Sequence, residues 1–334
     1  MKKKILVIGA TGALGSYVVP ELLALGYAVD GITLDNVTSD NPDVNYIVGQ
    51  ATDEMLAALF AKEHYAGIVD FIHYKPEVYA ERHKLLCENT DHLIFLSSYR
   101  TYADLEHPIR ETSPSWLDSS KDEFFLENET YAVWKSKGEK ILRASKYDNY
   151  TIVRPLISFS KRRFDLITCG APVLINRSRA KKPILLPLEA KNMVAGVGWA
   201  GNVGRMMARL VTSDKTFLEA YTLGSGEVRT WGEVAQIYTD LMGSEFIWVD
   251  TETYLEVATA RSHMDRWMLE CDRLLDRTID NSKVLAATGF TMSDMVQVPD
   301  ALEREYRALP ADVEFRMNPA VEARIDAFIR NYKG

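Results

Sequence analysis

Gly9-Ala10-Thr11-Gly12-Ala13-Leu14-Gly15 is the stretch that decides the fold, because it joins the apolar run Ile5 to Ile8 to a helical pattern over Ala13 to Leu25. A G-x-x-G-x-x-G loop is informative where it follows a strand and opens a helix. The glycines allow a tight turn and a close approach of the backbone to a pyrophosphate, whose charge then lies at the positive end of the helix. The stretch therefore predicts a dinucleotide-binding loop. The alternative is a glycine-rich turn that binds no ligand.

Apolar runs alternate with longer helical patterns through the first half of the chain. The runs are Ile5 to Ile8, Val29 to Leu34, Asn45 to Val48, Gly67 to His73, Leu93 to Ser97 and Thr151 to Arg154. Between them, helical spacing such as that of Asp53 to Lys62 is what crossover connections between parallel strands require. We therefore predict an α/β fold with a Rossmann-type, doubly wound parallel sheet.

The pattern changes after Pro155, and a smaller domain is expected from there on. A basic, loop-rich stretch runs to Asn192, and helical segments follow near 201–213, 230–242 and 251–275. Ala220 to Leu223 is typical of a late strand that returns to the sheet, so the two domains should interleave. The predicted division is a dinucleotide-binding domain over residues 1–157, completed by about residues 198–223, and a smaller C-terminal substrate domain over residues 158–197 and 224–334.

The composition favours a globular protein that acts on small molecules. The 334 residues are 47% hydrophobic and 26% charged, with a formal net charge of −8 and a pI of about 5.4. This charge opposes non-specific binding to nucleic acid and to anionic membranes. No stretch of the sequence is apolar enough to span a bilayer, the three cysteines are far apart, and the six histidines have no metal-binding spacing. We therefore expect a cytoplasmic protein that uses no metal.

Asp35 and the charges around it bear on which dinucleotide is bound. Asp35 stands 20 residues after Gly15, where an acid can bind the ribose hydroxyls of NAD and would repel the additional phosphate of NADP. No lysine or arginine occurs between Lys4 and Lys62, so this part of the chain offers no cation to that phosphate. The sequence thus predicts NAD as the cofactor. The alternative is that Asp35 is a solvated turn residue and that Thr33 takes the position at the strand end.

A tyrosine and a lysine one helical turn apart indicate acid–base chemistry. Tyr131 and Lys135 lie in Tyr-Ala-Val-Trp-Lys, so that both side chains can reach one substrate. A cation close to a tyrosine favours the phenolate form, which can exchange a proton with a substrate hydroxyl. Ser98 follows the apolar run at the edge of the sheet where such folds bind ligands, and its hydroxyl can orient the reacting alcohol. Alone, this tyrosine–lysine spacing also arises by chance on amphipathic helices, and both Ser97 and Ser98 can instead cap their own backbone.

These motifs together resemble the extended short-chain dehydrogenase/reductases, the NAD-dependent epimerase/dehydratase family, over nearly the whole chain. The matches are the glycine loop at Gly9, Gly12 and Gly15, the Ser-Tyr-Lys triad at Ser98, Tyr131 and Lys135, and the Arg-Pro pair at Arg154-Pro155. The resemblance implies catalysis by that triad and a homodimer that associates through helices flanking the sheet. It also implies a cofactor site made of Gly9, Thr11, Gly12, Ala13, Leu14, Gly15, Asp35, Asn36, Gln50, Ala51, His73, Tyr74, Ser97, Tyr131, Lys135 and Pro155.

Departures from the family pattern restrict the chemistry. Tyr99 and Arg100 stand where the family's dehydratases have an Asp-Glu pair and its sugar-nucleotide decarboxylases a glutamate, so neither reaction is expected. Ile157-Ser158-Phe159-Ser160 replaces the family's Asn-Val-Tyr-Gly, which leaves open whether the substrate carries a nucleotide. The short crossover after His73 and Tyr74 is similar to an atypical branch that includes the chloroplast stem-loop RNA-binding proteins.

Substrate contacts are expected from two places in the chain. Ser98, Tyr99 and Arg100 follow one strand of the predicted sheet. Arg177 and Arg179 belong to a basic cluster with Lys181, Lys182 and the residues at 161–163, and this cluster could hold a phosphate or a carboxylate. The alternative for the cluster is a solvated surface.

The predicted function is oxidation of a hydroxyl of a sugar or sugar nucleotide, either as a dehydrogenase or as an epimerase. Tyr131 would remove the proton of the hydroxyl while hydride passes to NAD. The competing hypothesis is an RNA-binding or scaffolding protein with an inherited NAD site, which a salt-dependent RNA titration would detect.

Overall fold

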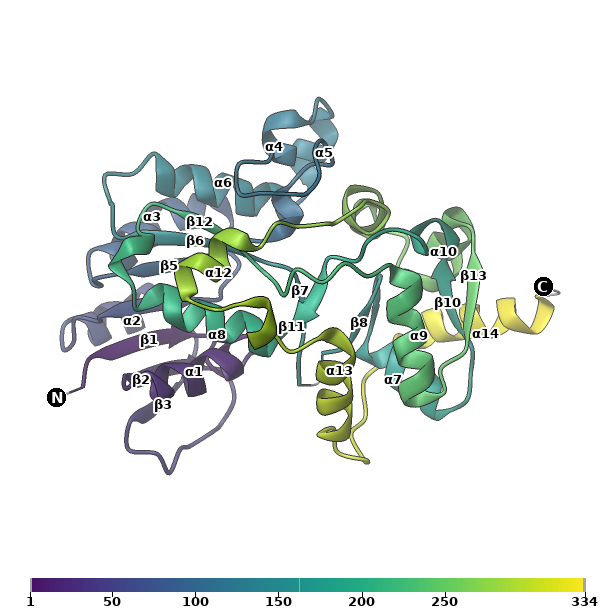
Figure 1. Cartoon of the computed structure of the whole chain (residues 1–334), viewed down its shortest axis with the longest axis horizontal. Helices are drawn as coiled ribbons and strands as arrows, with labels where there is room; N and C mark the ends of the chain where they lie inside the picture. Colours follow the sequence, from purple (N-terminus) through teal and green to yellow (C-terminus); the bar gives the residue numbers. More distant parts are fainter. Residues whose placement is uncertain (1, 162, 333–334) are drawn as a thin grey trace.

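A seven-stranded parallel sheet forms the larger lobe of the computed structural model, which describes residues 2–161 and 163–332 (Figure 1). The strand order is β12-β6-β5-β4-β1-β2-β3. The strands are β1 (Lys4–Ile8), β2 (Ala28–Thr33), β3 (Val44–Val48), β4 (Gly67–Asp70), β5 (Leu93–Leu96), β6 (Tyr150–Pro155) and β12 (Ala220–Leu223). The predicted doubly wound α/β fold is confirmed, and so is the late strand, which pairs in parallel with β6 at the edge of the sheet.

Helices cover both faces of this sheet. Alternate side chains of a strand point to opposite faces, so β1 sends Ile5 and Val7 into one apolar layer and Leu6 and Ile8 into the other. The first layer packs against α1 (Gly15–Ala24), α8 (Ala200–Val211) and α12 (Ser282–Thr288), and the second against α2 (Asp53–Phe60), α3 (Pro76–Cys87) and α6 (Ala132–Arg143). Burial on both faces explains why the strands have continuous apolar sequences.

Two predicted elements differ from the structure for local reasons. The strand expected over Gly67 to His73 ends at Asp70, whose side chain accepts a hydrogen bond from the Ile72 amide at 3.0 Å and starts a turn. The helical segment expected over 251–275 is divided into α10 (Thr251–Ala258), α11 (His263–Met268) and a π-helical turn, Leu269–Arg273. It is broken because Arg261 has a φ of 64° and Ser262 begins a new helix with a capping box.

The smaller lobe is assembled from the segments after β6 and after β12. Its elements are β8 (Asp165–Leu166), β9 (Cys169–Gly170), α7 (Ala171–Arg179), β10 (Ile184–Pro187), α9 (Trp231–Met242), β13 (Phe246–Val249), α13 (Val298–Arg307) and α14 (Pro319–Asn331), while β7 (Ile157–Phe159) and β11 (Val197–Trp199) pair beside the sheet. Figure 1 shows this lobe opposite the N-terminus, with α12 back against the sheet. The residue limits of the two domains stay a prediction.

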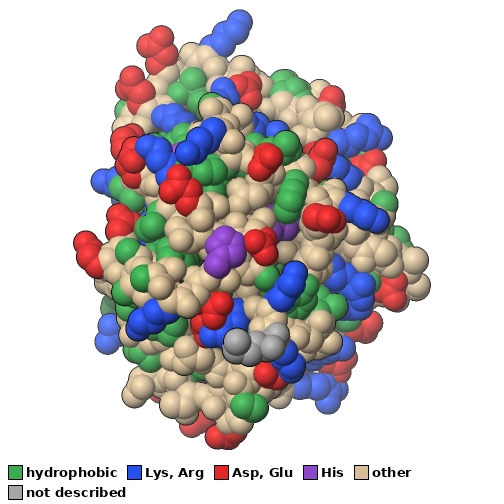
Figure 2. All heavy atoms as spheres, turned by 90° about the vertical axis from the view of Figure 1, so that its left-hand side faces the viewer, with side chains coloured by type: hydrophobic (Ala, Val, Ile, Leu, Met, Phe, Trp, Pro, Cys, Tyr) green, Lys and Arg blue, Asp and Glu red, His purple; other side chains and the backbone are tan. Residues whose placement is uncertain are grey.

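Two short helices, α4 (Trp116–Ser119) and α5 (Glu123–Asn128), precede α6 and project from the larger lobe (Figure 1). On the face of that lobe seen in Figure 2, acidic and basic side chains are interspersed. In the described part of the chain, no helix combines the length and the apolar character that crossing a membrane requires.

Candidate active site

The glycine loop lies between β1 and α1, where the sequence placed it. Gly9 has a φ of 91°, a conformation that favours glycine, and its amide donates to the carbonyl of Ile32 on the neighbouring strand at 2.9 Å. A Cβ on Gly15 would collide with the carbonyl oxygen of Gly9 and lie 2.8 Å from that of Ala10. The loop is therefore folded back tightly on the start of the helix, and Gly15 is required there because the loop's own backbone fills the space of a side chain.

A cavity of about 670 Å³ opens beside this loop at the carboxyl ends of β1, β2 and β4. Of the predicted cofactor residues, it is lined by Gly9, Gln50, Ala51 and Tyr74. Asp35 directly follows Leu34, which lines the cavity, and its carboxylate accepts a hydrogen bond from the Thr11 hydroxyl at 2.6 Å. Asn36 is exposed and does not line the cavity.

Arg82 also lines this cavity and was not predicted. It reaches the cavity from α3 and donates to the carbonyl of Ala51 at 2.7 Å, and it lies 2.8 Å from the carboxylate of Asp53. The segment without lysine and arginine ends before α3. The absence of cations in that segment therefore gave no information about Arg82. Asp53 already neutralises the charge of Arg82. Arg82 is therefore not a free cation that could bind the additional phosphate of NADP.

A second cavity, of about 480 Å³, brings the predicted catalytic residues Ser98 and Tyr131 together with Leu14 of the glycine loop. Ser98 ends the segment after β5, and its hydroxyl accepts a hydrogen bond from the Arg100 amide at 3.2 Å. The other residues that line it are Leu96, Ser97, Tyr99, Arg100, Pro155, Leu156, Ile157, Ser158, Arg163, Asp165, Ile167, Thr168, Gly170, Met268 and Arg273. This cavity is the candidate site of reaction.

Tyr131 and Lys135 are one turn apart at the start of α6. Tyr131 is the N-cap residue, and the Lys135 amide donates to the Tyr131 carbonyl at 2.9 Å. The Lys135 ammonium is 3% exposed and donates to the carbonyl of Leu96, at the end of β5, at 2.6 Å. Burial lowers the pKa of Lys135 to about 8, although Asp70 and Glu139 oppose this shift. The lysine thus joins the catalytic helix to the edge of the sheet.

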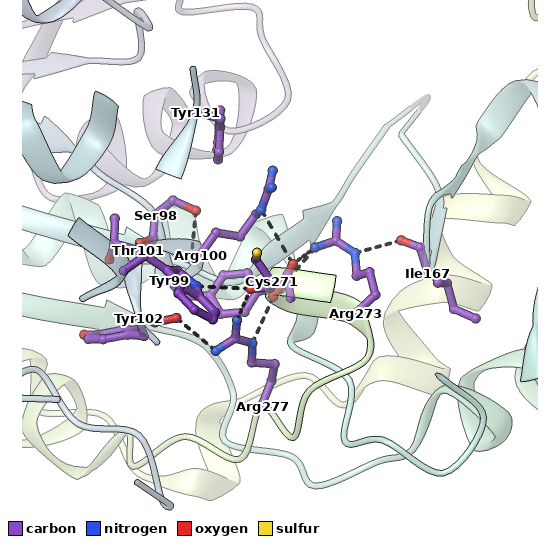
Figure 3. A network of polar contacts seen from close by, with 12 residues as sticks. Ser98, Tyr99, Arg100, Thr101, Tyr102, Tyr131, Ile167, Cys271, Arg273 and Arg277 are labelled. Carbon is purple, nitrogen blue, oxygen red and sulfur yellow. Dashed lines mark hydrogen bonds and ion pairs between the residues drawn. The ribbon is translucent and has the colours of Figure 1, made fainter. Parts of the chain in front are cut away.

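The structure places a second cation beside Tyr131. The guanidinium of Arg100 lies 4.9 Å from the centre of the Tyr131 ring, and Figure 3 shows its side chain running from the Ser98 segment toward that ring. The ring of His73 lies 5.4 Å from that of Tyr131, centre to centre, and its Nε2 bonds to the carbonyl of Thr130 at 2.7 Å. His73 therefore lies beside the tyrosine, and its predicted contact with the cofactor stays a prediction.

Solved structures of sugar epimerases share this architecture, although no family model and no curated protein sequence matches the chain. The epimerase Mth375 of Methanothermobacter thermautotrophicus aligns with a TM-score of 0.70 and 15% identity over 92% of this chain and 91% of its own. The UDP-N-acetylglucosamine 4-epimerase of Bacillus cereus has a TM-score of 0.67 and 16% identity, with 94% and 99% covered. The UDP-glucuronic acid 4-epimerase of Bacillus cereus, solved with UDP-glucuronic acid and NAD, has a TM-score of 0.67 and 16% identity, with 91% and 98% covered.

The chain has the fold of sugar epimerases. At these identities the likeness establishes the fold, and the chemistry has to be argued from the residues of this chain.

Ser97 was expected to contact the cofactor, but its hydroxyl is used within the epimerase-like fold. It is buried and donates to the carboxylate of Glu139 on α6. The same carboxylate accepts from Arg154 Nε at 2.8 Å, and Arg154 also donates to the Tyr102 hydroxyl at 2.8 Å. This buried network fixes α6 against β5 and β6, and so positions Tyr131.

Arg177 and Arg179, which were predicted to hold the substrate, do not line the cavity. Arg177 is 1% exposed and pairs with Glu322 at 2.8 Å and with Asp326 at 3.0 Å, both on α14. Arg179 donates to the carbonyls of Val313 and Pro310. The acidic partners lie almost 150 residues further along the chain, so the local sequence could not indicate this pairing.

Other cations take that place in the cavity. Arg163, from the basic stretch near the predicted cluster, lines it, and so does Arg273 of the π-helical turn, which the sequence did not single out. Arg162 lies outside the described residues. Tyr99 also lines the cavity, although its hydroxyl donates to the carboxylate of Asp272 at 2.7 Å. Among the described residues, no group of three or more His, Cys, Asp and Glu side chains is arranged to hold a metal ion.

Proposed function

We propose that this protein is an NAD-dependent oxidoreductase or epimerase that acts on a hydroxyl of a sugar or sugar nucleotide. The observation that carries the proposal is the second cavity, where Ser98 and Tyr131 face the same space as Leu14 of the glycine loop. A group bound along the loop and a substrate bound between the two hydroxyls would be in contact there. Such contact is the requirement for hydride transfer.

The residues present fit a bound dinucleotide. The tight loop at Gly9 and Gly15 would hold the pyrophosphate at the start of α1, and the cavity at Gln50 and Ala51 would take the adenosine. Asp35, held near the loop by Thr11, would bind the ribose hydroxyls, which favours NAD over NADP. Structural neighbours solved with NAD, such as WbmG of Bordetella bronchiseptica, support this choice. When bound, NAD accepts a hydride from the carbon of the reacting alcohol and can return it.

Each of the three predicted catalytic residues has a task in that reaction. Tyr131, as the phenolate, accepts the proton of the substrate hydroxyl as the alcohol becomes a ketone, and gives it back on reduction. Ser98 holds the substrate oxygen in place. Lys135, which donates to the carbonyl of Leu96, supplies a positive charge one helical turn after the tyrosine. Return of the hydride to the opposite face of the ketone would make the enzyme an epimerase, and its release as NADH would make it a dehydrogenase.

The substrate class is supported by the structural neighbours, two of which are described as 4-epimerases of UDP-linked sugars. The predicted homodimer, the substrate domain and the similarity to the chloroplast stem-loop branch belong to the same proposal and stay predictions. The net charge of −8 opposes non-specific binding of RNA.

Replacement of Tyr131 by phenylalanine tests the proposal, because it removes only the hydroxyl. Wild-type protein would be incubated with NAD and a panel of free and UDP-linked sugars. NADH absorbance would report net oxidation, and NMR of the products would report redox-neutral epimerisation. We expect Tyr131→Phe to bind NAD as the wild type does and to lose at least about 100-fold in turnover.

Tyr332→Phe is the matched control, since Tyr332 is exposed near the C-terminal end of the described chain and should leave turnover unchanged. Full activity of Tyr131→Phe would refute the assigned proton transfer.

A further inference from the structure

Arg100 is a buried guanidinium without a hydrogen-bond partner. Its side chain is 10% exposed and lines the cavity that holds Tyr131. None of its side-chain nitrogens donates a hydrogen bond within residues 2–161 and 163–332, and Nε is fully buried without a partner. A buried N–H without an acceptor costs free energy, and Nε is the one side-chain nitrogen of Arg100 that is fully buried in this way. Such a group indicates a missing acceptor.

The nearest carboxylates do not supply that acceptor. Glu129 and Asp272 each lie 3.7 Å from a nitrogen of Arg100, which is beyond hydrogen-bond distance. Glu129 uses one oxygen to accept from the amides of Tyr131 and Val133, at 3.0 and 2.8 Å. Both carboxylates therefore attract Arg100 without satisfying its donors.

The neighbouring arginines are satisfied by the protein. Arg277 Nε lies 3.0 Å from Asp272, and its other nitrogens donate to the carbonyls of Cys271 and Tyr102. Arg273 pairs with the same carboxylate and donates to the carbonyl of Ile167 at 2.9 Å, as Figure 3 shows. Arg273 and Arg277 thus share Asp272, and among the described residues Arg100 is the arginine of this cluster that has no hydrogen-bonded carboxylate.

Arg100 is next to the predicted reaction centre. Arg100 lies 4.9 Å from the ring centre of Tyr131, and its own amide is bonded to the hydroxyl of Ser98. A substrate whose reacting hydroxyl contacts Tyr131 would therefore place the atoms on the next one or two carbons within reach of this guanidinium.

We propose that Arg100 binds a carboxylate of the substrate, and that the substrate is an acidic sugar such as a uronic or aldonic acid, free or nucleotide-linked. A planar guanidinium binds both oxygens of a carboxylate with two parallel hydrogen bonds. A carboxylate also matches the charge of one guanidinium, whereas a phosphate monoester would bring close to two negative charges at neutral pH. This assignment makes Arg100 a specificity residue, and it rests on the proposed function for the position of the reacting carbon.

The experiment compares each acid with its neutral amide. NAD-saturated protein would be titrated by calorimetry with D-glucuronate, D-galacturonate, D-gluconate and UDP-glucuronate, and with the corresponding amides. We expect at least one acid to bind about 10- to 100-fold more tightly than its amide, the range for hydrogen bonds to a charged group. Arg100→Gln should remove this difference, and Arg100→Lys, which keeps the charge but not the planar fork, should keep part of it.

Two controls separate binding from folding. Arg143→Gln replaces an exposed arginine on α6 and should keep the full preference for the acid. The Tm and the Kd for NAD show whether Arg100→Gln is folded. Arg100→Lys tests the preference for the acid in a protein that keeps the buried positive charge.

The proposal would be overturned by equal binding of acid and amide across the panel, by absence of binding to every acid, or by a preference that survives in folded Arg100→Gln. Tighter binding of inorganic phosphate than of the carboxylates would overturn it as well.

The same variants separate this proposal from the proposed function. If the acids bind through Arg100 but neither NADH nor an epimer forms, the redox function fails and the carboxylate assignment stands. If neutral sugars turn over and Arg100→Gln leaves their KM and that of the acids unchanged, the redox function stands and the assignment of Arg100 fails.

Discussion

Gly15→Ala tests whether the tight loop is the dinucleotide site, because the substitution adds one methyl group where only backbone surrounds it. The new Cβ would collide with the carbonyl oxygen of Gly9 and lie 2.8 Å from the oxygen and 2.9 Å from the carbon of the Ala10 carbonyl. No side chain can rotate away, so the loop itself has to move. Overpacking of this kind costs about 1–3 kcal/mol, which corresponds to a fall in Tm of roughly 2–10 °C.

The same movement displaces the amides that would face the pyrophosphate. Loss of one or two hydrogen bonds to a charged group weakens binding by about 10- to 100-fold. Calorimetric titration with NAD and a thermal melt would measure both effects. Gly198→Ala is the matched control, because the nearest atom to its Cβ would be Leu156 Cδ1 at 3.9 Å, an ordinary contact. A Gly15→Ala protein that binds NAD as tightly as the wild type would refute the placement of the pyrophosphate.

Three further variants address charges around the site. Lys135→Met should abolish turnover and raise the free energy of unfolding by about 1–3 kcal/mol below pH 8. The reason is that the pKa of Lys135 is about 8 in the folded protein and ordinarily 10.5, so folding disfavours the charged lysine. This gain in stability should shrink as the pH rises from 8 toward 10.5, where the unfolded chain also loses the proton. Urea unfolding at several pH values would measure it, and a gain that grows with pH would contradict the prediction. Glu139→Gln breaks the buried pair with Arg154 and should cost about 3–5 kcal/mol in the free energy of unfolding, whereas a loss below 1 kcal/mol would mean that the pair does not fix α6. Asp35→Ala should reduce the preference for NAD over NADP by about tenfold in Kd, and an unchanged ratio would show that Asp35 does not read the ribose.

Local patterns along the chain were sufficient to predict the sheet and the glycine loop. The central strands are buried on both faces and have continuous apolar sequences, as Ile5 to Ile8 illustrates. The Tyr131 to Lys135 spacing was also readable, because one helical turn is a local distance. Helix α3 was read only as a short crossover, since its buried face contains Arg82 and His83 as well as apolar residues, which obscures the helical pattern.

The substrate side of the site depends on pairings between distant segments. Arg177 and Arg273 are both basic residues after Pro155, and nothing local distinguishes them. The fold turns Arg177 toward α14 and brings Arg273 to the cavity through a π-helical turn that the sequence did not indicate. Arg100 was predicted to touch the substrate, but the sequence could not show that its guanidinium lacks a hydrogen-bond partner. That depends on the position of Asp272, which is distant in the sequence.

The position of β12 determines the order in which the nascent chain can complete its sheet. Strand β6 ends at Pro155, and the strand that covers its edge ends at Leu223, so 68 residues must be synthesised in between. At translation rates of about 5–20 residues per second, the edge of β6 stays open for several seconds. An apolar, unpaired edge is a template for association with other chains. During its synthesis the chain is therefore exposed to association with other chains through the edge of β6, which β12 covers in the finished fold.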